Sequence, residues 1–165
     1  MGKELPVRKD MRLKGYDYSS AGCYFITVCI RTQEFLFGNI IAGEMHLSEN
    51  GNIAKNELLH IPRHYENVKI DKYTIMPNHI HAIITIVGAP LAAPAGEGTG
   101  RASASPTIGN IVRGYKAGVS RSIGFTPWQR SYHDHIIRDD TEYHRISQCI
   151  DQNPATWQQD QYYTE

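Results

Sequence analysis

Two histidines, His79 and His81, are the residues of this chain whose type and spacing best suit metal chemistry. They lie two residues apart in the segment HIHAIITIV, residues 79–87, which is typical of a β-strand. Because side chains alternate between the two faces of a strand, both imidazoles point to the same side. At this spacing they can bind one divalent ion. The alternative interpretation is two polar residues on the solvent side of a strand.

The other face of this strand indicates where the core lies. It carries four apolar residues, Ile80, Ala82, Ile84 and Ile86. We expect these to pack under helices and the histidine face to stay open for function. His133 and His135 repeat the same spacing in a second predicted strand, with the same two interpretations. A metal on such a face would act as a Lewis acid on a phosphate oxygen, and it would need a third ligand and a nucleophile.

The elements that position these residues follow from periodicity and capping signals. Strands are predicted at residues 23–30, 68–76, 79–87 and 131–138, with a hairpin over FLFGNII and EMHLS that turns at Ala42-Gly43. Helices are predicted over 49–61 with Ser48 as N-cap and Pro62 at the end, from Ser105-Pro106 to about Ile123, and over 141–152 with Asp140 as N-cap and Pro154 beyond. This order predicts an α+β, ferredoxin-like antiparallel sheet with two helices on one face and an added C-terminal helix.

Composition sets further bounds on the chain. Its 165 residues suit a single domain, and the Gly/Ala/Pro-rich segment 88–104 is interpreted as a flexible loop inside it. No apolar run approaches the roughly 20 residues that span a bilayer, and no signal peptide is evident, so a cytoplasmic protein without a membrane role is expected. The 17 basic and 17 acidic residues balance, which argues against bulk attraction to nucleic acid. Three cysteines without a CxxC pair favour reduced thiols: Cys23, Cys29 and Cys149.

Four stretches of the sequence carry a family resemblance. The segment MPNHIHAII, residues 76–84, resembles the HUH motif of single-tyrosine transposases, with Ile80 as the bulky apolar residue between the histidines. The stretches RLKGYDYSSAGCYFITVCI, WQRSYHDHIIRDD and ISQCIDQNPATW are similar to the REP-associated tyrosine transposase branch of that family. The matches come in order and span almost the whole chain.

The resemblance implies a site and a substrate. It implies a divalent metal, magnesium or manganese, held by His79, His81 and, on the last helix, Asn153. It also implies a tyrosine four residues before Asn153 that attacks a phosphodiester of single-stranded DNA with imperfect hairpins. Residues i and i+4 share a helix face, so both positions would face the metal. This sequence has Cys149 at the tyrosine position.

Cysteine is shorter than tyrosine by most of an aromatic ring, so weak or no strand cleavage is predicted through Cys149. The chain is then an inactive relative that still binds DNA, a copy with a substitution of its own, or a protein in which another tyrosine serves. The substitute tyrosines are Tyr132, Tyr143, Tyr162 and Tyr163, of which the first two have the least suitable geometry. A hydrolase that uses water at the metal in place of tyrosine is a further alternative.

Two basic groups gain a role from the resemblance. Positive charge and aromatic rings alternate in the N-terminal segment, and three cations lie on the second predicted helix. These residues are expected to contact phosphates or stack on bases, the alternative being solvated surface. The predicted DNA-binding residues are Arg12, Lys14, Tyr16, Arg113, Lys116 and Arg121. Whether the chain acts as a monomer or a homodimer stays open.

Overall fold

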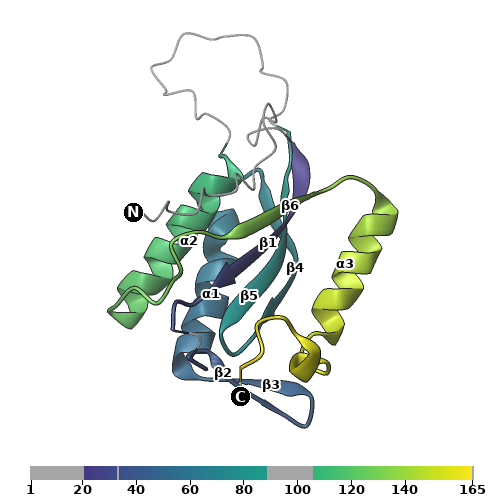
Figure 1. Ribbon diagram of the computed structural model, residues 1–165. Coiled ribbons are helices and arrows are strands. Elements are labelled where there is room, and N and C mark those ends of the chain that lie inside the picture. The colour runs from purple at the N-terminus through teal and green to yellow at the C-terminus, as the bar shows by residue number, and fades with distance from the viewer. Residues whose placement is uncertain (1–20, 33, 89–105, 165) are drawn as a thin grey trace, which may run out of the picture.

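The computed structural model describes residues 21–32, 34–88 and 106–164. The predicted DNA-binding residues Arg12, Lys14 and Tyr16 lie outside the described residues, as does most of the predicted loop 88–104. Figure 1 shows a central sheet with helices on both sides.

The sheet is antiparallel and has the strand order β4-β5-β1-β6. These strands are Val68–Ile75, His79–Ile86, Gly22–Cys29 and His133–Ile137. Strand β1 lies between β5 and β6 and pairs with both in antiparallel register. With the helices placed between the strands along the chain, this order is that of the predicted ferredoxin-like fold. The prediction of an α+β, ferredoxin-like sheet is confirmed.

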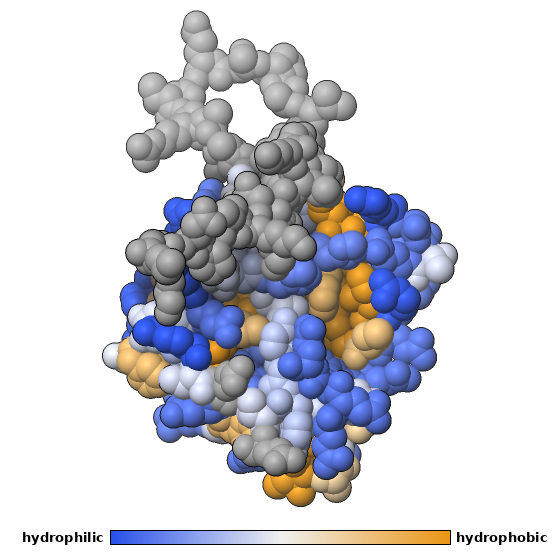
Figure 2. Space-filling view, in the orientation of Figure 1, coloured by the Kyte–Doolittle hydropathy of each residue, from blue (hydrophilic) through white to orange (hydrophobic). Residues whose placement is uncertain are grey.

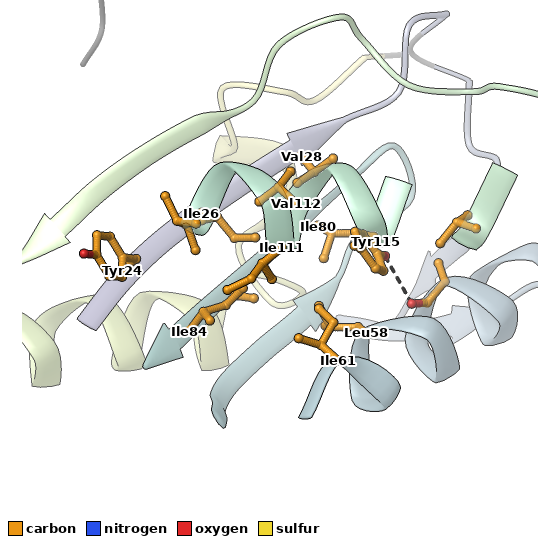
Figure 3. Close-up of a cluster of buried hydrophobic side chains, with 14 of the residues drawn as sticks. Tyr24, Ile26, Val28, Leu58, Ile61, Ile80, Ile84, Ile111, Val112 and Tyr115 are labelled. Carbon is orange, nitrogen blue, oxygen red and sulfur yellow. Dashed lines mark hydrogen bonds between the residues drawn. The ribbon is translucent and has the colours of Figure 1, made fainter. Parts of the chain in front are cut away.

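Helices α1 (Glu49–His64) and α2 (Ile108–Ile123) pack together on one face of the sheet, and α3 (Asp140–Gln152) lies on the other (Figure 1). The core forms between α1, α2 and the sheet, as Figure 3 shows. Ile80, Ala82, Ile84 and Ile86 are all part of it, as their alternation predicts. Burying each isoleucine contributes about 1.5–3 kcal/mol, so these side chains fix which face of β5 points to the helices.

A smaller apolar cluster attaches α3 to the opposite face. Ile146 and Ile150 of α3 pack on Ile83 of β5 and Ile137 of β6. Because Ile146 and Ile150 are four residues apart, they form one stripe on the helix. Figure 2 shows apolar surface in the region between the sheet and α3, in a view that is otherwise largely hydrophilic. This stripe sets the orientation of α3, and with it the face that carries Cys149.

Three helix boundaries differ from prediction. Helix α1 continues past Pro62 to His64, since a proline in the last turn removes only one backbone bond. Helix α2 is capped by Thr107, whose hydroxyl accepts from the Asn110 N–H at 3.1 Å. Helix α3 is capped by Asp139 instead of Asp140. The Ser48 cap of α1 is confirmed, with its hydroxyl accepting from the Gly51 N–H at 3.0 Å.

A separate hairpin precedes α1, formed by β2 (Gly38–Ile41) and β3 (Glu44–Leu47). Its turn lies at Ala42-Gly43 as predicted, with φ of 53° and 80°. Two consecutive residues with positive φ match the twist of a two-residue hairpin turn. After α3 the chain forms a short 3-10 helix, η1 (Trp157–Gln159), and then returns to the sheet. Among the described residues, none of the helices has the length and apolar character needed to cross a membrane.

Candidate metal centre and adjoining pocket

The two histidines of β5 aim one nitrogen each at the same point. The Nε2 atoms of His79 and His81 lie 3.0 Å apart. Their Nδ1 atoms point away from each other, toward Asn78 Oδ1 at 2.9 Å and Thr27 Oγ1 at 2.8 Å. Thr27 can reach His81 because the two residues are direct partners in the β1–β5 ladder. The two Nδ1 atoms are thus held by hydrogen bonds, while the two Nε2 atoms converge on one point.

Hydrogen bonds fix the proton position on His79 and leave two arrangements for His81. The side-chain N–H of Asn78 donates to the Tyr162 carbonyl at 2.7 Å, so Asn78 Oδ1 is left to accept from His79 Nδ1. Nε2 of His79 therefore carries a lone pair. The Thr27 hydroxyl can rotate. It accepts from His81 Nδ1 when the two Nε2 atoms share a cation, and donates to His81 Nδ1 when they share a proton.

The pair is buried, contrary to the expectation of an open histidine face. His79 is 0% and His81 8% exposed. Burial lowers the pKa of His79 to about 2, and repulsion from the neighbouring His81 adds to this shift. Burial, followed by repulsion from His133, lowers the pKa of His81 to about 4. Both imidazoles are therefore neutral at physiological pH, which is the form that binds metal ions.

The C-terminal segment closes this face of the sheet. The centroid of the Tyr162 ring lies 4.7 Å from that of His79, and the centroid of the Trp157 ring lies 6.0 Å from it. The segment is held by the Asn78–Tyr162 hydrogen bond and by a turn in which Tyr162 N–H donates to Asp160 Oδ1 at 2.7 Å. Alternation along β5 predicts that the histidines share a face, but it contains no signal for what covers that face.

Asp160 is the functional candidate that sequence reasoning missed. Its Oδ2 lies 3.6 Å from His79 Nε2, and one ligand atom each of His79, His81 and Asp160 fall within 4.8 Å of one another. Burial raises the pKa of Asp160 while burial lowers that of His79, so the contact is not a stable ion pair. A charge on the carboxylate instead favours a cation placed between the three groups.

The donor set fits a divalent cation. Two cis ligands at about 2.1 Å from a six-coordinate ion are about 3.0 Å apart, which matches the Nε2–Nε2 separation of 3.0 Å. Two neutral imidazoles with a carboxylate suit a first-row ion such as manganese, and the Nδ1 partners Asn78 and Thr27 are typical supports of ligating histidines. Asn153, the predicted third ligand, has its side chain hydrogen-bonded to Asp160. Asn153 would therefore either orient the Asp160 carboxylate or supply a further oxygen ligand itself.

A pocket of about 410 Å³ opens beside the histidine pair. It brings together several residues that the sequence analysis singled out, namely His81, Cys149 and Asn153. Asp160 and Phe25 also line it, and the Phe25 ring stacks on His81 at 5.2 Å. Cys149 is exposed in this pocket. Positions 149 and 153 thus both face the pocket that His81 lines.

None of the four substitute tyrosines is among the residues that line this pocket. Burial raises the pKa of Tyr162 to about 12, and the nearby Cys29 adds to this shift. The Tyr162 hydroxyl is hydrogen-bonded to Cys29. Such a phenol is less easily ionised than a free one. Tyr163 packs on Trp157, with ring centroids 5.4 Å apart, Tyr143 packs against the α3 cluster, and Tyr132 packs against the main core.

The remaining predicted residues are dispersed. His135 Nε2 lies 2.6 Å from Glu142 Oε1, which ties β6 to α3. Lys116 Nζ donates to the carbonyls of Gln129 and Ser131, both at 2.9 Å. Lys116 and Arg121 line one groove, whereas Arg113 is exposed on α2 and is not part of the groove lining.

Comparison with known proteins supports the fold. No protein-family model matches the sequence. The chain is 43% identical over 170 residues to an uncharacterized protein of Haemophilus influenzae, an alignment that covers 96% of this chain and 94% of that protein. Its structure is similar to that of a REP-associated tyrosine transposase bound to a REP hairpin, with a TM-score of 0.59 and 20% identity over 82% of this chain and 68% of the other. The chain therefore belongs to the same family as the Haemophilus influenzae protein and has the fold of the REP-associated tyrosine transposase, as its motifs predict.

Proposed function

We propose that this chain binds single-stranded DNA with imperfect hairpins and a divalent metal, at a site of the tyrosine transposase type whose strand cleavage is impaired. The observation that carries the proposal is the convergence of His79 Nε2, His81 Nε2 and Asp160 beside an open pocket. The fold is shared with a transposase whose structure contains a REP hairpin, which supports DNA as the ligand.

His79, His81 and Asp160 would hold the metal, with Asn153 adjacent. When bound, the ion would polarise a phosphate oxygen and offset charge that develops on phosphorus. The protein's own residues supply orientation: Asn78 and Thr27 fix the two rings, and the Phe25 ring packs flat against His81. Tyr162 and Trp157 keep water away from His79.

Cys149 is the reason to expect impaired cleavage. It stands in the pocket at the position where the resemblance places a tyrosine. A cysteine sulfur lies close to the helix backbone, so it falls short of the point that a phenolic oxygen reaches. No described tyrosine in the pocket lining takes its place. DNA and metal binding should persist, because the residues assigned to them do not include Cys149.

The test uses a labelled single-stranded oligonucleotide that contains a REP hairpin with single-stranded flanks, incubated with protein and manganese. Denaturing gels should show no covalent adduct for the natural chain and a protein–DNA adduct for Cys149→Tyr. Cys149→Phe is the matched control, since it restores the ring without the hydroxyl and should give no adduct. An adduct on the natural chain would refute impairment. Bound DNA without an adduct, both in Cys149→Tyr and after the covering Tyr162 ring is also removed, would refute the placement of position 149.

A second function is favoured by the covered histidine pair. In this alternative the chain is a DNA-hairpin binding protein without cleavage, in which Asp160 and Tyr162 close the former catalytic face. Cys149→Tyr would then bind the oligonucleotide yet form an adduct only when Tyr162→Ala also removes the ring that covers His79. Comparing the adduct yield of Cys149→Tyr with that of Cys149→Tyr/Tyr162→Ala, which keeps Asp160, separates the two functions.

A further inference from the structure

The two histidines of β6 have different surroundings. His133 and His135 are two residues apart in this strand, so both side chains point to the same face of the sheet. His135 is engaged, because its Nε2 lies 2.6 Å from Glu142 Oε1. His133 is exposed, and its side chain has no hydrogen-bond or ion-pair partner among the described residues. One imidazole of β6 is therefore available to a ligand.

His133 lies in the same row of the sheet as His81. Thr27 of β1 is the register partner of His81 on one side and of His133 on the other. Directly paired residues point to the same face, so the three side chains stand side by side on the face of the candidate metal centre. Neighbouring strands are about 4.8 Å apart, which puts the Cα atoms of His81 and His133 about 10 Å apart. Repulsion from His133 is the second cause, after burial, of the lowered pKa of His81, in agreement with this proximity.

The row ends at an edge of the sheet. In the strand order β4-β5-β1-β6, β6 is an outer strand. Helix α3 contacts β4 and β5 on this face (Figure 1), and the rings of Trp157 and Tyr162 pack on His79. These contacts cover the β5 side of the row, whereas His133 on the β6 side is exposed. The candidate metal centre thus has a polar, accessible side chain on its β6 side.

A phosphate at the metal centre would need hydrogen-bond donors as well as the cation. The pocket beside the histidine pair includes no lysine or arginine among its described lining residues. The phosphate oxygens that the cation leaves free therefore depend on other donors. An imidazole carries at least one N–H in both of its protonation states, so His133 is a donor in either of them. A hydrogen bond from it to a charged phosphate oxygen is roughly twice as strong as one between neutral groups.

From this placement we infer that His133 donates an imidazole N–H to one oxygen of a phosphodiester whose other oxygen lies at the candidate metal centre. This inference rests on the proposed function and adds a phosphate-binding residue to that site. His81 supplies a ring nitrogen for the cation, and His133, two strands away, supplies a donor for the anion. Contacts to two different oxygens orient the phosphate, which a contact to the cation alone would leave free to turn.

The first test measures the Kd of the oligonucleotide that contains a REP hairpin with single-stranded flanks, in a chelator so that no cation contributes. His133→Leu removes the donor and should raise the Kd about tenfold, as expected for one hydrogen bond to a charged group. His133→Gln keeps an N–H donor and should raise it by less than about threefold. His64→Leu, at an exposed histidine of α1, is the matched control and should leave the Kd unchanged.

A set of oligonucleotides, each with one neutral methylphosphonate in the flank, identifies the phosphate. At one position the methylphosphonate should raise the Kd of the natural chain about tenfold yet hardly change that of His133→Leu, because both changes remove the same contact. Losses that add at every position would overturn the inference and leave the proposed function in place. Absence of oligonucleotide binding by the natural chain would overturn both.

Manganese affinity without DNA separates a phosphate contact from a metal ligand. His133→Leu should leave this affinity unchanged in a calorimetric titration, because His79, His81 and Asp160 are intact. A loss of about tenfold or more would make His133 part of the metal centre and overturn the inference. The free energy of unfolding in urea should also stay unchanged, because the substituted side chain is exposed.

Discussion

Acid should destabilise this protein through its two buried histidines. Burial lowers the pKa of His79 to about 2 and that of His81 to about 4, whereas an unfolded histidine titrates near 6.5. Between these values the unfolded chain binds protons that the native chain does not. The free energy of unfolding therefore falls as the pH drops below about 6.5. The contribution of His81 ends near pH 4, and that of His79 continues below it.

The size of the loss follows from the linkage between protons and folding. Each histidine contributes a slope of about 1 kcal/mol per pH unit once the unfolded side chain is protonated. Together, His79 and His81 should remove about 2–3 kcal/mol per unit below about pH 5.5. Small domains are stable by only about 5–15 kcal/mol, so a loss of this size is readily measured.

Urea denaturation with a chelator, at a series of pH values from about 7 down to 5, measures this loss. His64→Gln, a change at an exposed histidine, should leave the pH dependence as it is. His81→Gln should reduce the slope of the free energy of unfolding against pH by the contribution of one histidine. A free energy of unfolding that stays constant from neutral pH to about 5 would refute the burial of a neutral pair, and with it the closure of this face by the C-terminal segment.

Two further changes test the candidate metal centre, and a third tests the packing of α1. Asp160→Asn should weaken manganese binding by about 10–100-fold in a calorimetric titration, because the carboxylate charge is lost while the turn with Tyr162 is kept. Thr27→Val should weaken it about as much and cost about 1–3 kcal/mol in urea, since His81 Nδ1 is left buried without a partner. Gly51→Ala should lower the free energy of unfolding by about 1–3 kcal/mol or more, because its Cβ would overlap the Phe37 carbonyl. Unchanged manganese affinity in both Asp160→Asn and Thr27→Val would contradict the assignment of the metal centre.

The sequence allows the sheet and its two faces to be predicted because alternation is a local signal. Ile80 and its alternate neighbours point to the helices for the same reason that His79 and His81 share the opposite face. The i, i+4 spacing of residues 149 and 153 likewise places both toward the pocket. Helix ends were less predictable, since Asp139 and Asp140 are equivalent as capping residues until the backbone is known.

The closure of the site could not be predicted in the same way. Asp160 and Tyr162 lie beyond the last helix in a polar segment without periodicity. Their positions depend on contacts with Asn78 and Cys29, residues more than 80 positions away in the chain. The available sequence signal is Asp160 followed by Tyr162 and Tyr163. It becomes informative only once the β1–β5 ladder brings Cys29 beside the histidine strand.

The register of strand β1 cannot shift by one residue without exchanging the residues on its two faces. Tyr24, Ile26 and Val28 fill the core, while Phe25, Thr27 and Cys29 on the reverse side serve the pocket, His81 and Tyr162. Inserting or deleting one residue would exchange the two sets along the strand beyond it. Ile26 would then stand under His81 and Thr27 in the apolar interior. Correct folding and the proposed metal site therefore depend on one register of β1, so an insertion or deletion inside this strand should disrupt both.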